Sequence, residues 1–192
     1  MKVYGKTLAL ATAVLSLPLY IVAQNSQSSS GMVPVNAALS HDLDAQKDRP
    51  GSQFEAKLSQ KVRLSDGTEL PSGAVLIGKV VEDDMQQQGT SKLALRFDQA
   101  RLKDGKVIPI RATIVGIFRP SADSEPPSNW TTGTLQVDQL GVMPGVDLHS
   151  KTASEDSGVF VSTKKDDVKL DRGSMIQLAI APGANQSNVG GS

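Results

Sequence analysis

The two histidines are the first residues to consider for metal binding or proton transfer. His41 stands in the string HDLD beside Asp42 and Asp44, and His149 lies far along the chain. A metal site needs three or four converging ligands, and the sequence offers no second cluster at a known spacing. We therefore predict no metal-binding residues. We interpret His41 as a solvated residue at the entry to the fold and His149 as an exposed residue of a polar loop.

Two acidic pairs, Asp83-Asp84 and Asp166-Asp167, resemble the paired carboxylates of glycoside hydrolases. Such carboxylates must face one another across a cleft, and binding of a sugar calls for aromatic side chains. Trp130 is the only tryptophan, and aromatic residues make up 4% of the chain. We therefore interpret both pairs as solvated charges at turns.

Nucleophilic catalysis has no support in the sequence. Ser72 lies in PSGAV and Ser174 in RGSMI, and neither string has the G-x-S-x-G pattern of a nucleophile elbow. The absence of cysteine excludes disulfides, thiolate metal sites and cysteine nucleophiles. No glycine-rich phosphate loop precedes a helix, and Asn129-Trp130-Thr131 matches only a glycosylation pattern. We predict no catalytic residues, no cofactor-binding residues and no cofactor.

Residues 1–23 have the three-part pattern of a secretory signal peptide. Lys2 and Lys6 form the positive region, and an uncharged stretch follows from Leu8 to Ala23, before Gln24. This stretch of about 16 residues is shorter than the roughly 20 that a membrane span needs. We expect a cleaved signal, with an uncleaved anchor or a buried N-terminal helix as the alternatives. The expected location is the periplasm or cell envelope, with secretion less favoured.

The net charge bears on the choice of partners. The chain has 20 basic and 20 acidic residues, so that loss of Lys2 and Lys6 with the signal leaves 18 basic residues and a charge near −2. A chain of this charge has no overall attraction for nucleic acid or anionic lipid. We expect no nucleic-acid partner, and membrane contact only through the N-terminal segment if it is not cleaved.

Composition divides the rest of the chain into a domain and two tails. Residues 24–40 are predicted as a flexible linker because QNSQSSSG is polar and of low complexity, although folded structure can begin from about Met32. Residues 41–181 are predicted as a β domain and 182–192 as a disordered tail. Residues 119–156 are rich in proline and polar residues and are predicted as a long excursion, with one short strand at 134–137. We find no internal repeat.

Alternating or continuous apolar residues indicate strands in the β domain. The expected strands cover residues 54–58, 62–64, 74–81, 93–102, 107–117, 159–161 and 175–180. The fold class that these strands favour is all-β, a small sandwich or barrel of about six to seven mostly antiparallel strands. We expect the core to include Phe54, Leu76, Leu95, Phe97 and Ile110.

Glycine and proline mark the turns and irregularities between these strands. Asp104-Gly105 predicts a two-residue hairpin turn, in which both positions favour positive φ. Gly78 inside its strand predicts a bulge or a close backbone approach, and Pro109 predicts an edge or a bulge. Gly67, Pro71 and Gly73 are expected at turns.

One part of the sequence resembles a known family. The strings ALSHDLDAQKDRPGSQFEAKLSQKVRLSDGTELPSGAVLIGKV, LALRFDQARLKDGKVIPI and LDRGSMIQLAI are similar to the C-terminal β domain of TrbI-like proteins, the channel scaffolds of conjugation and type IV secretion systems. The turn residues Leu70, Pro71 and Gly73, followed by Gly78, match the family's turn and strand. The family's membrane-crossing helical insertion corresponds to 119–156, which is polar and could not span lipid. The resemblance therefore implies a similar β domain and a similar docking role, and it does not imply a channel.

Three classes of function remain open from the sequence. The first is a non-catalytic periplasmic scaffold or interaction domain, with other envelope proteins as partners and with homo-oligomers as a further arrangement. The second is a ligand-binding or surface-adhesion module that uses the 119–156 loop, and ordering of that loop on ligand addition would favour it. The third is a hydrolase with an unrecognised site, which a deep polar pocket with a strongly perturbed carboxylate would favour.

Overall fold

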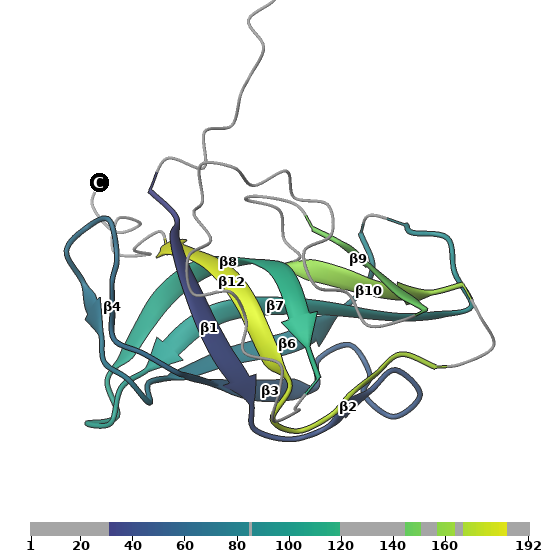
Figure 1. Cartoon of the computed structure of the whole chain (residues 1–192), viewed down its shortest axis with the longest axis horizontal. Helices are drawn as coiled ribbons and strands as arrows, with labels where there is room; N and C mark the ends of the chain where they lie inside the picture. Colours follow the sequence, from purple (N-terminus) through teal and green to yellow (C-terminus); the bar gives the residue numbers. More distant parts are fainter. Residues whose placement is uncertain (1–30, 85, 120–144, 151–156, 164–166, 184–192) are drawn as a thin grey trace, which may run out of the picture.

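The structure is a computed structural model, which describes residues 31–84, 86–119, 145–150, 157–163 and 167–183 (Figure 1). All regular elements in these ranges are strands, so the all-β prediction is confirmed. The strands are β1 (Val33–Leu39), β2 (Leu43–Asp44), β3 (Gln53–Leu58), β4 (Val62–Arg63), β5 (Glu69–Leu70), β6 (Val75–Val81), β7 (Ser91–Arg101), β8 (Val107–Phe118), β9 (Val146–His149), β10 (Gly158–Ser162), β11 (Lys169–Leu170) and β12 (Met175–Pro182).

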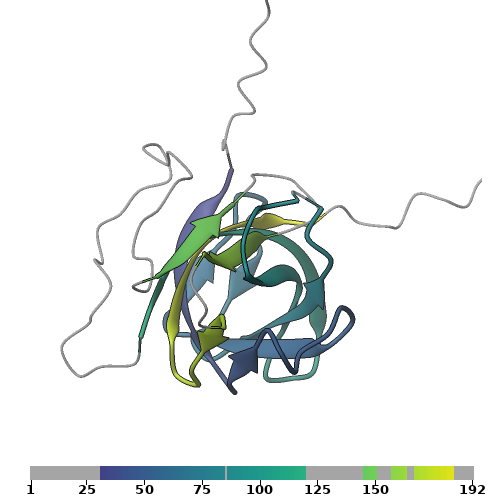
Figure 2. The same ribbon diagram turned by 90° about the vertical axis from the view of Figure 1, so that its right-hand side faces the viewer.

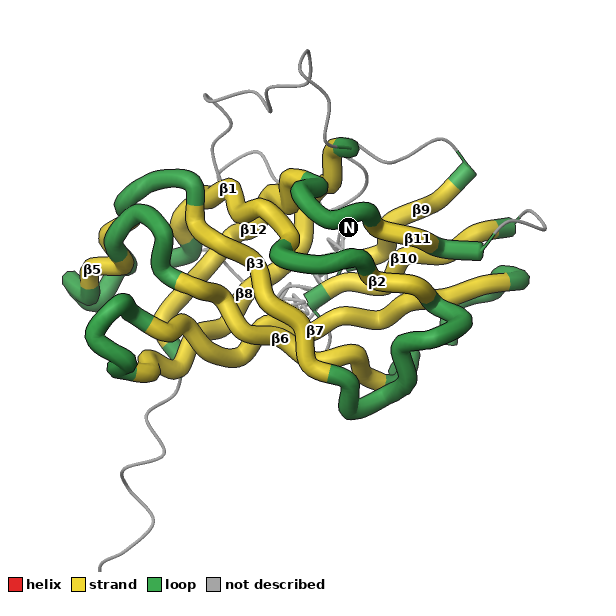
Figure 3. The backbone as a smooth tube through the Cα atoms, turned by 90° about the horizontal axis from the view of Figure 1, so that it is seen from below, coloured by secondary structure: helices red, strands yellow, loops and turns green. Residues whose placement is uncertain are grey.

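Six strands close into an antiparallel barrel in the order β6-β3-β1-β12-β8-β7, because β6 also pairs with β7. Figure 2 shows this ring of strands nearly end-on. β10 continues the sheet from β7, and β9 pairs with β10 at its edge. Two small two-stranded sheets, β4-β5 and β2-β11, complete the described strands (Figure 3). Of the two predicted architectures, the structure has the barrel.

One hydrophobic cluster fills the barrel. Phe54, Leu76 and Leu95 are fully buried, and Phe97 and Ile110 are nearly so, as predicted. The rings of Phe54 and Phe97 meet edge to face, with centroids 4.9 Å apart. Inward side chains alternate with outward ones along β3, in agreement with the period of two in its sequence. β6 alternates in the same way, although its sequence is a nearly continuous apolar run.

The folded part begins earlier than predicted. β1 lies inside residues 24–40, which were predicted as a linker, and it pairs with β12 on one side and β3 on the other. Val35, Ala37 and Leu39 point into the core and are at most 2% exposed. The alternation was overlooked because two of the seven residues of β1 are alanines, whose small side chains give a weak hydrophobic signal.

The C-terminal boundary also differs by two residues from the predicted start of the tail at 182. β12 extends through Pro182, and the backbone N–H of Gly183 donates to the Pro109 carbonyl at 3.0 Å. Pro109 pairs with Gln99 of β7, and β12 pairs with β8 only as far as Ile110. Pro109 therefore lies just beyond the end of the β12 ladder, which agrees with its predicted place at an edge, although β8 itself is an inner strand of the barrel.

The hairpin between β7 and β8 forms at the predicted place with a different turn. Gly105 has a φ of 85°, whereas Gln86 is the only non-glycine residue with positive φ in the described chain, so Asp104 keeps an ordinary φ. The Gly105 N–H donates to the Leu102 carbonyl at 3.0 Å, and the Asp104 carboxylate accepts from the Lys106 N–H at 3.0 Å. One positive φ is sufficient because the turn is longer than two residues.

Gly78 shows both of its predicted features. The register between β6 and β7 shifts between Ile77 and Gly78, so that Asp98 is an extra, bulged residue on β7. A Cβ atom at Gly78 would lie 2.4 Å from Cζ of Phe54 and 2.6 Å from the Arg96 carbonyl oxygen. Glycine is therefore required by the close approach of the strands and the Phe54 ring.

The excursion predicted over 119–156 is interrupted by a strand. β9 pairs with β10, and its Val146 and Leu148 are 8% and 1% exposed. Asp147 and His149 alternate with them, so His149 is a half-buried strand residue and not an exposed loop residue. The short strand predicted at 134–137 lies outside the described residues.

The described strands contain a repeated unit that the sequence analysis did not find. The pattern A-x-L-S-x-x-[LV] occurs twice. It begins at Ala37 and covers the end of β1 and the start of β2, and it begins again at Ala56 and covers the end of β3 and the start of β4. Their partners, β11 with β12 and β5 with β6, share L-x-x-G, beginning at Leu170 and Leu70. The backbone hydrogen bonds of the two repeats also correspond. Gly173 N–H donates to Leu39 O, and Gly73 N–H donates to Leu58 O, both at 2.9 Å.

β7 and β8 diverge beyond Gln99 and Pro109, and Ser157 lies in the fork between them. The Ser157 N–H donates to Leu95 O at 2.8 Å, and its carbonyl accepts from the Ile114 N–H at 2.8 Å. Its hydroxyl accepts from the Phe97 N–H at 2.8 Å. Ser157 therefore links both barrel strands to the start of β10.

Candidate functional site

The residues of the HDLD string have separate structural partners. The Asp42 carboxylate accepts from the Arg172 N–H at 2.6 Å. Asp44 accepts from the Gln46 N–H at 2.9 Å and lies 3.7 Å from the Lys169 ammonium. His41 is exposed. No group of three or more metal-binding side chains occurs in the described ranges. The structure therefore does not bring these three residues together as ligands.

The acidic pairs serve local structure where they are described. Asp83 accepts from the Gln87 N–H at 2.7 Å and pairs with Lys92 at 3.1 Å, which holds the turn before β7. Asp84 is exposed, and Asp167 accepts a hydrogen bond from the Gln46 side chain. Asp166 lies outside the described residues. The two pairs belong to different loops and form no shared carboxylate site in the described chain.

The two serines occupy the turns of the repeated unit. The Ser72 hydroxyl donates to Ser59 O at 3.1 Å. Ser174 is fully buried, and its hydroxyl has no hydrogen-bond partner in the described chain. Neither serine therefore has a base positioned beside it among the described residues. The glycosylation-like triplet at residues 129–131 lies outside the described residues.

Two carboxylates have pKa values below their usual range. The Gln46 backbone N–H is the main cause of the lowered pKa of Asp44, and Lys169 and Lys47 add to it while burial opposes it. A hydrogen bond from Lys61, with its positive charge, lowers the pKa of Glu69, and Arg63 adds to the effect. A general acid would need a raised pKa, so these groups are ion-pair partners on the small sheets.

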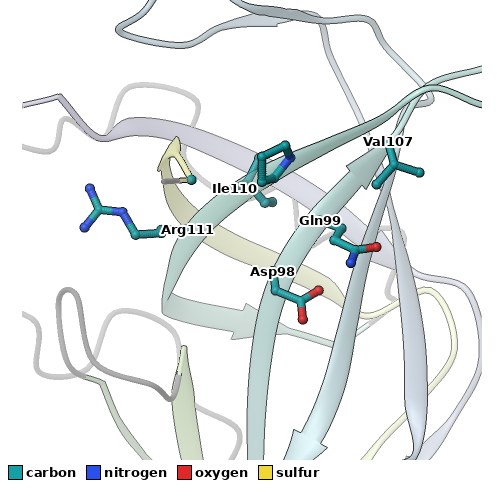
Figure 4. Close-up of a pocket in the computed structure, with 7 residues that line it drawn as sticks. Asp98, Gln99, Val107, Ile110 and Arg111 are labelled. Carbon is teal, nitrogen blue, oxygen red and sulfur yellow. The ribbon is translucent and has the colours of Figure 1, made fainter. Parts of the chain in front are cut away.

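A surface hollow of about 560 Å³ lies against β7 and the first half of β8 (Figure 4). Asp98 and Gln99 lie next to one another on β7, and Val107 and Arg111 lie at either end of the facing stretch of β8. The bulge at Asp98 turns its side chain out of the regular alternation, and one of its carboxylate oxygens is buried without a hydrogen-bond partner in the described chain.

A second hollow of about 330 Å³ adjoins the first at Val107, Pro109 and Gly183. Asp66 and Lys106 border it on the side of the hairpin turns. The described residues of the two hollows offer carboxylate, amide, guanidinium and apolar groups, which are suited to contacts with a polypeptide. Of the residues that line the hollows, the sequence singled out Pro109 and Ile110, both as structural residues. Asp98 and Arg111 were not predicted, because strand pairing alone places them on the same hollow.

The described residues contain no helix long and apolar enough to cross a membrane. Comparison of the sequence with models of known protein families and with curated proteins finds no match.

Proposed function

We propose that this chain is an exported, non-catalytic scaffold or interaction domain of the cell envelope, similar in role to the β domain of TrbI-like channel scaffolds. Export to the periplasm is part of the proposal and is supported by the signal-like pattern of residues 1–23. The partners would be other envelope proteins or further copies of the chain.

The observation that carries this proposal is the place of the family-like residues in the barrel. Leu70 is fully buried at the start of the turn, and Gly73 has a φ of 80°. Gly78 lies at the bulge against Phe54, and Gly105 lies in the hairpin between β7 and β8. All four residues shape the barrel wall, so the resemblance concerns architecture and supports a scaffold more than a reaction.

The native mass of the full chain, gently extracted from its own envelope, tests the proposal. We expect a complex well above the mass of one chain that contains envelope proteins of a secretion or conjugation apparatus. A lone monomer would contradict the proposal, and ligand screening against the predicted excursion at residues 119–156 would then follow.

A further inference from the structure

The outward side of β3, β6, β7 and β8, together with the hairpin 102–106, is positively charged, and we call it the basic face. Two of its three acidic side chains are paired with cations, and the third, Asp104 in the hairpin, is exposed and accepts the Lys106 N–H. Glu55 pairs with Arg101 at 2.6 Å, and Asp98 lies 3.8 Å from the Lys79 ammonium. Because these two acids are paired, the remaining cations determine the net charge of the face.

Four cations of the basic face have no carboxylate within 4.0 Å in the described chain: Lys57, Lys103, Lys106 and Arg111. All four are exposed. Lys57 and Lys103 converge above Gly73, since their Cε atoms lie 3.3 and 3.6 Å from the position of a Cβ at that glycine. Two ammonium groups held near one another without a counter-charge favour a bound anion.

Apolar side chains lie between these cations. Val75, Arg101 and Val107 form one row across β6, β7 and β8, and Ile77, Gln99 and Pro109 form the next row. Val107 is 48% exposed and is the only large hydrophobic residue so exposed in the described chain. The two hollows described above adjoin at Val107 and Pro109.

The mixture of cations and apolar side chains on the basic face favours a protein over a nucleic acid as the binding partner. Single-stranded nucleic acids stack on exposed aromatic rings. Phe54, Phe97 and Phe160 are buried, and Phe118, at the end of β8 away from the hairpin, is half-buried. The described part of the basic face therefore has no large exposed aromatic platform. Carboxylates would pair with the free cations, and apolar side chains would cover Val107 and Pro109.

We propose that the basic face is a docking surface for an acidic segment of a partner protein, in which aspartate or glutamate residues alternate with apolar ones. This inference rests on the proposed function and names the chemistry of its partner. The nearly neutral net charge of the whole chain conceals the face, because acidic residues such as Asp42, Asp83 and Asp147 lie on other elements.

Binding of a labelled peptide of alternating glutamate and valine to the full chain in mild detergent tests this proposal, with fluorescence anisotropy as the readout. The test variant is Lys57→Gln/Lys103→Gln/Arg111→Gln. The control variant, Arg49→Gln/Lys169→Gln/Arg172→Gln, loses the same charge outside the basic face. Thermal unfolding of both variants verifies that the barrel is intact. Val107→Ser tests the apolar contribution separately.

We expect the peptide Kd to rise about tenfold or more in the test variant and less than about twofold in the control, with weaker binding at higher salt. Absence of peptide binding, equal losses in the two variants, or equally tight binding of a single-stranded oligonucleotide would overturn the inference. A native complex that persists in the test variant would contradict the docking surface and leave the proposed scaffold function unaffected. A lone monomer of the unaltered chain would contradict the scaffold function itself.

Discussion

Asp44 and Glu69 occupy opposite strands of equivalent small sheets. Asp44 on β2 lies opposite Lys169, and Arg63 on β4 lies opposite Glu69, so the two repeats carry the same ion pair with the charges exchanged. Each carboxylate has a lowered pKa because neighbouring donors and cations stabilise its charged form. The charged forms therefore contribute to the stability of the small sheets.

Acid should remove the contribution of Asp44. Its folded pKa lies below the ordinary value of 3.8, so the stabilisation is present above about that pH and is lost as the pH falls through the folded pKa. We expect Asp44→Asn to lower the denaturation midpoint at neutral pH and to make stability less dependent on pH in acid. Denaturant unfolding at several pH values measures this. Asp147→Asn on β9 serves as the control, and an unchanged pH profile in Asp44→Asn would contradict the prediction.

Ser174 should be replaceable by alanine without loss of stability. Its buried hydroxyl lacks a partner in the described chain, and the equivalent residue of the other repeat is the buried Ala74. Ser174→Ala should be neutral or stabilise the barrel by up to about 1 kcal/mol, whereas Ala74→Ser should cost about 1–3 kcal/mol. Chemical denaturation of both variants compares them. A loss above about 1 kcal/mol in Ser174→Ala would indicate an unrecognised role for the hydroxyl.

At the scale of elements, the fork between β7 and β8 determines how the β9-β10 hairpin joins the barrel. The barrel strands separate there, and β10 takes the place of β8 as the neighbour of β7. Gly158 fits closely in this fork, because a Cβ there would lie 3.1 Å from Ile114 and Leu148 side-chain atoms. The hairpin is therefore attached by packing as well as by strand pairing.

Ser157→Ala should weaken this attachment. The change leaves the buried Phe97 N–H without its acceptor, which costs about 1–3 kcal/mol. We expect faster hydrogen exchange at the Phe97 amide and in β9 and β10 than in β1 and β12. Ser162→Ala, at the other end of β10, is the matched control. Uniform exchange across all strands of the Ser157→Ala variant would argue against a local role.

At the scale of the whole molecule, β1 completes the barrel by joining β12 to β3. A chain that starts at residue 32 retains β1, whereas one that starts at residue 41 lacks it and exposes the edges of both neighbours. We expect the first to unfold cooperatively and the second to lose cooperative unfolding or aggregate. Thermal unfolding followed by circular dichroism distinguishes them, and a cooperative transition in the shorter chain would show that β1 is dispensable.

Local sequence patterns predicted much of the fold. The strands at β3, β6, β7, β8 and β12, the hairpin at Gly105, and the bulge at Gly78 followed from residues close together in the chain. Alternation and turn chemistry are local properties, so a single sequence carries them. β1 and β9 were missed because their short apolar patterns lie within polar surroundings, which resemble a linker and a loop.

Tertiary structure alone decided the rest. The repeated unit joins segments 19 residues apart on one side and 100 on the other, as between Leu39 and Leu58 and between Leu70 and Leu170. Asp98 and Arg111 line the same hollow, and Lys57 and Lys103 both approach Gly73, only because pairing between distant strands places them there. The sequence by itself therefore determined the long strands with clear apolar patterns and the all-β class, which depend on neighbouring residues. Barrel closure, the hollows and the segregation of charge depend on pairing between distant strands, which no local pattern specifies.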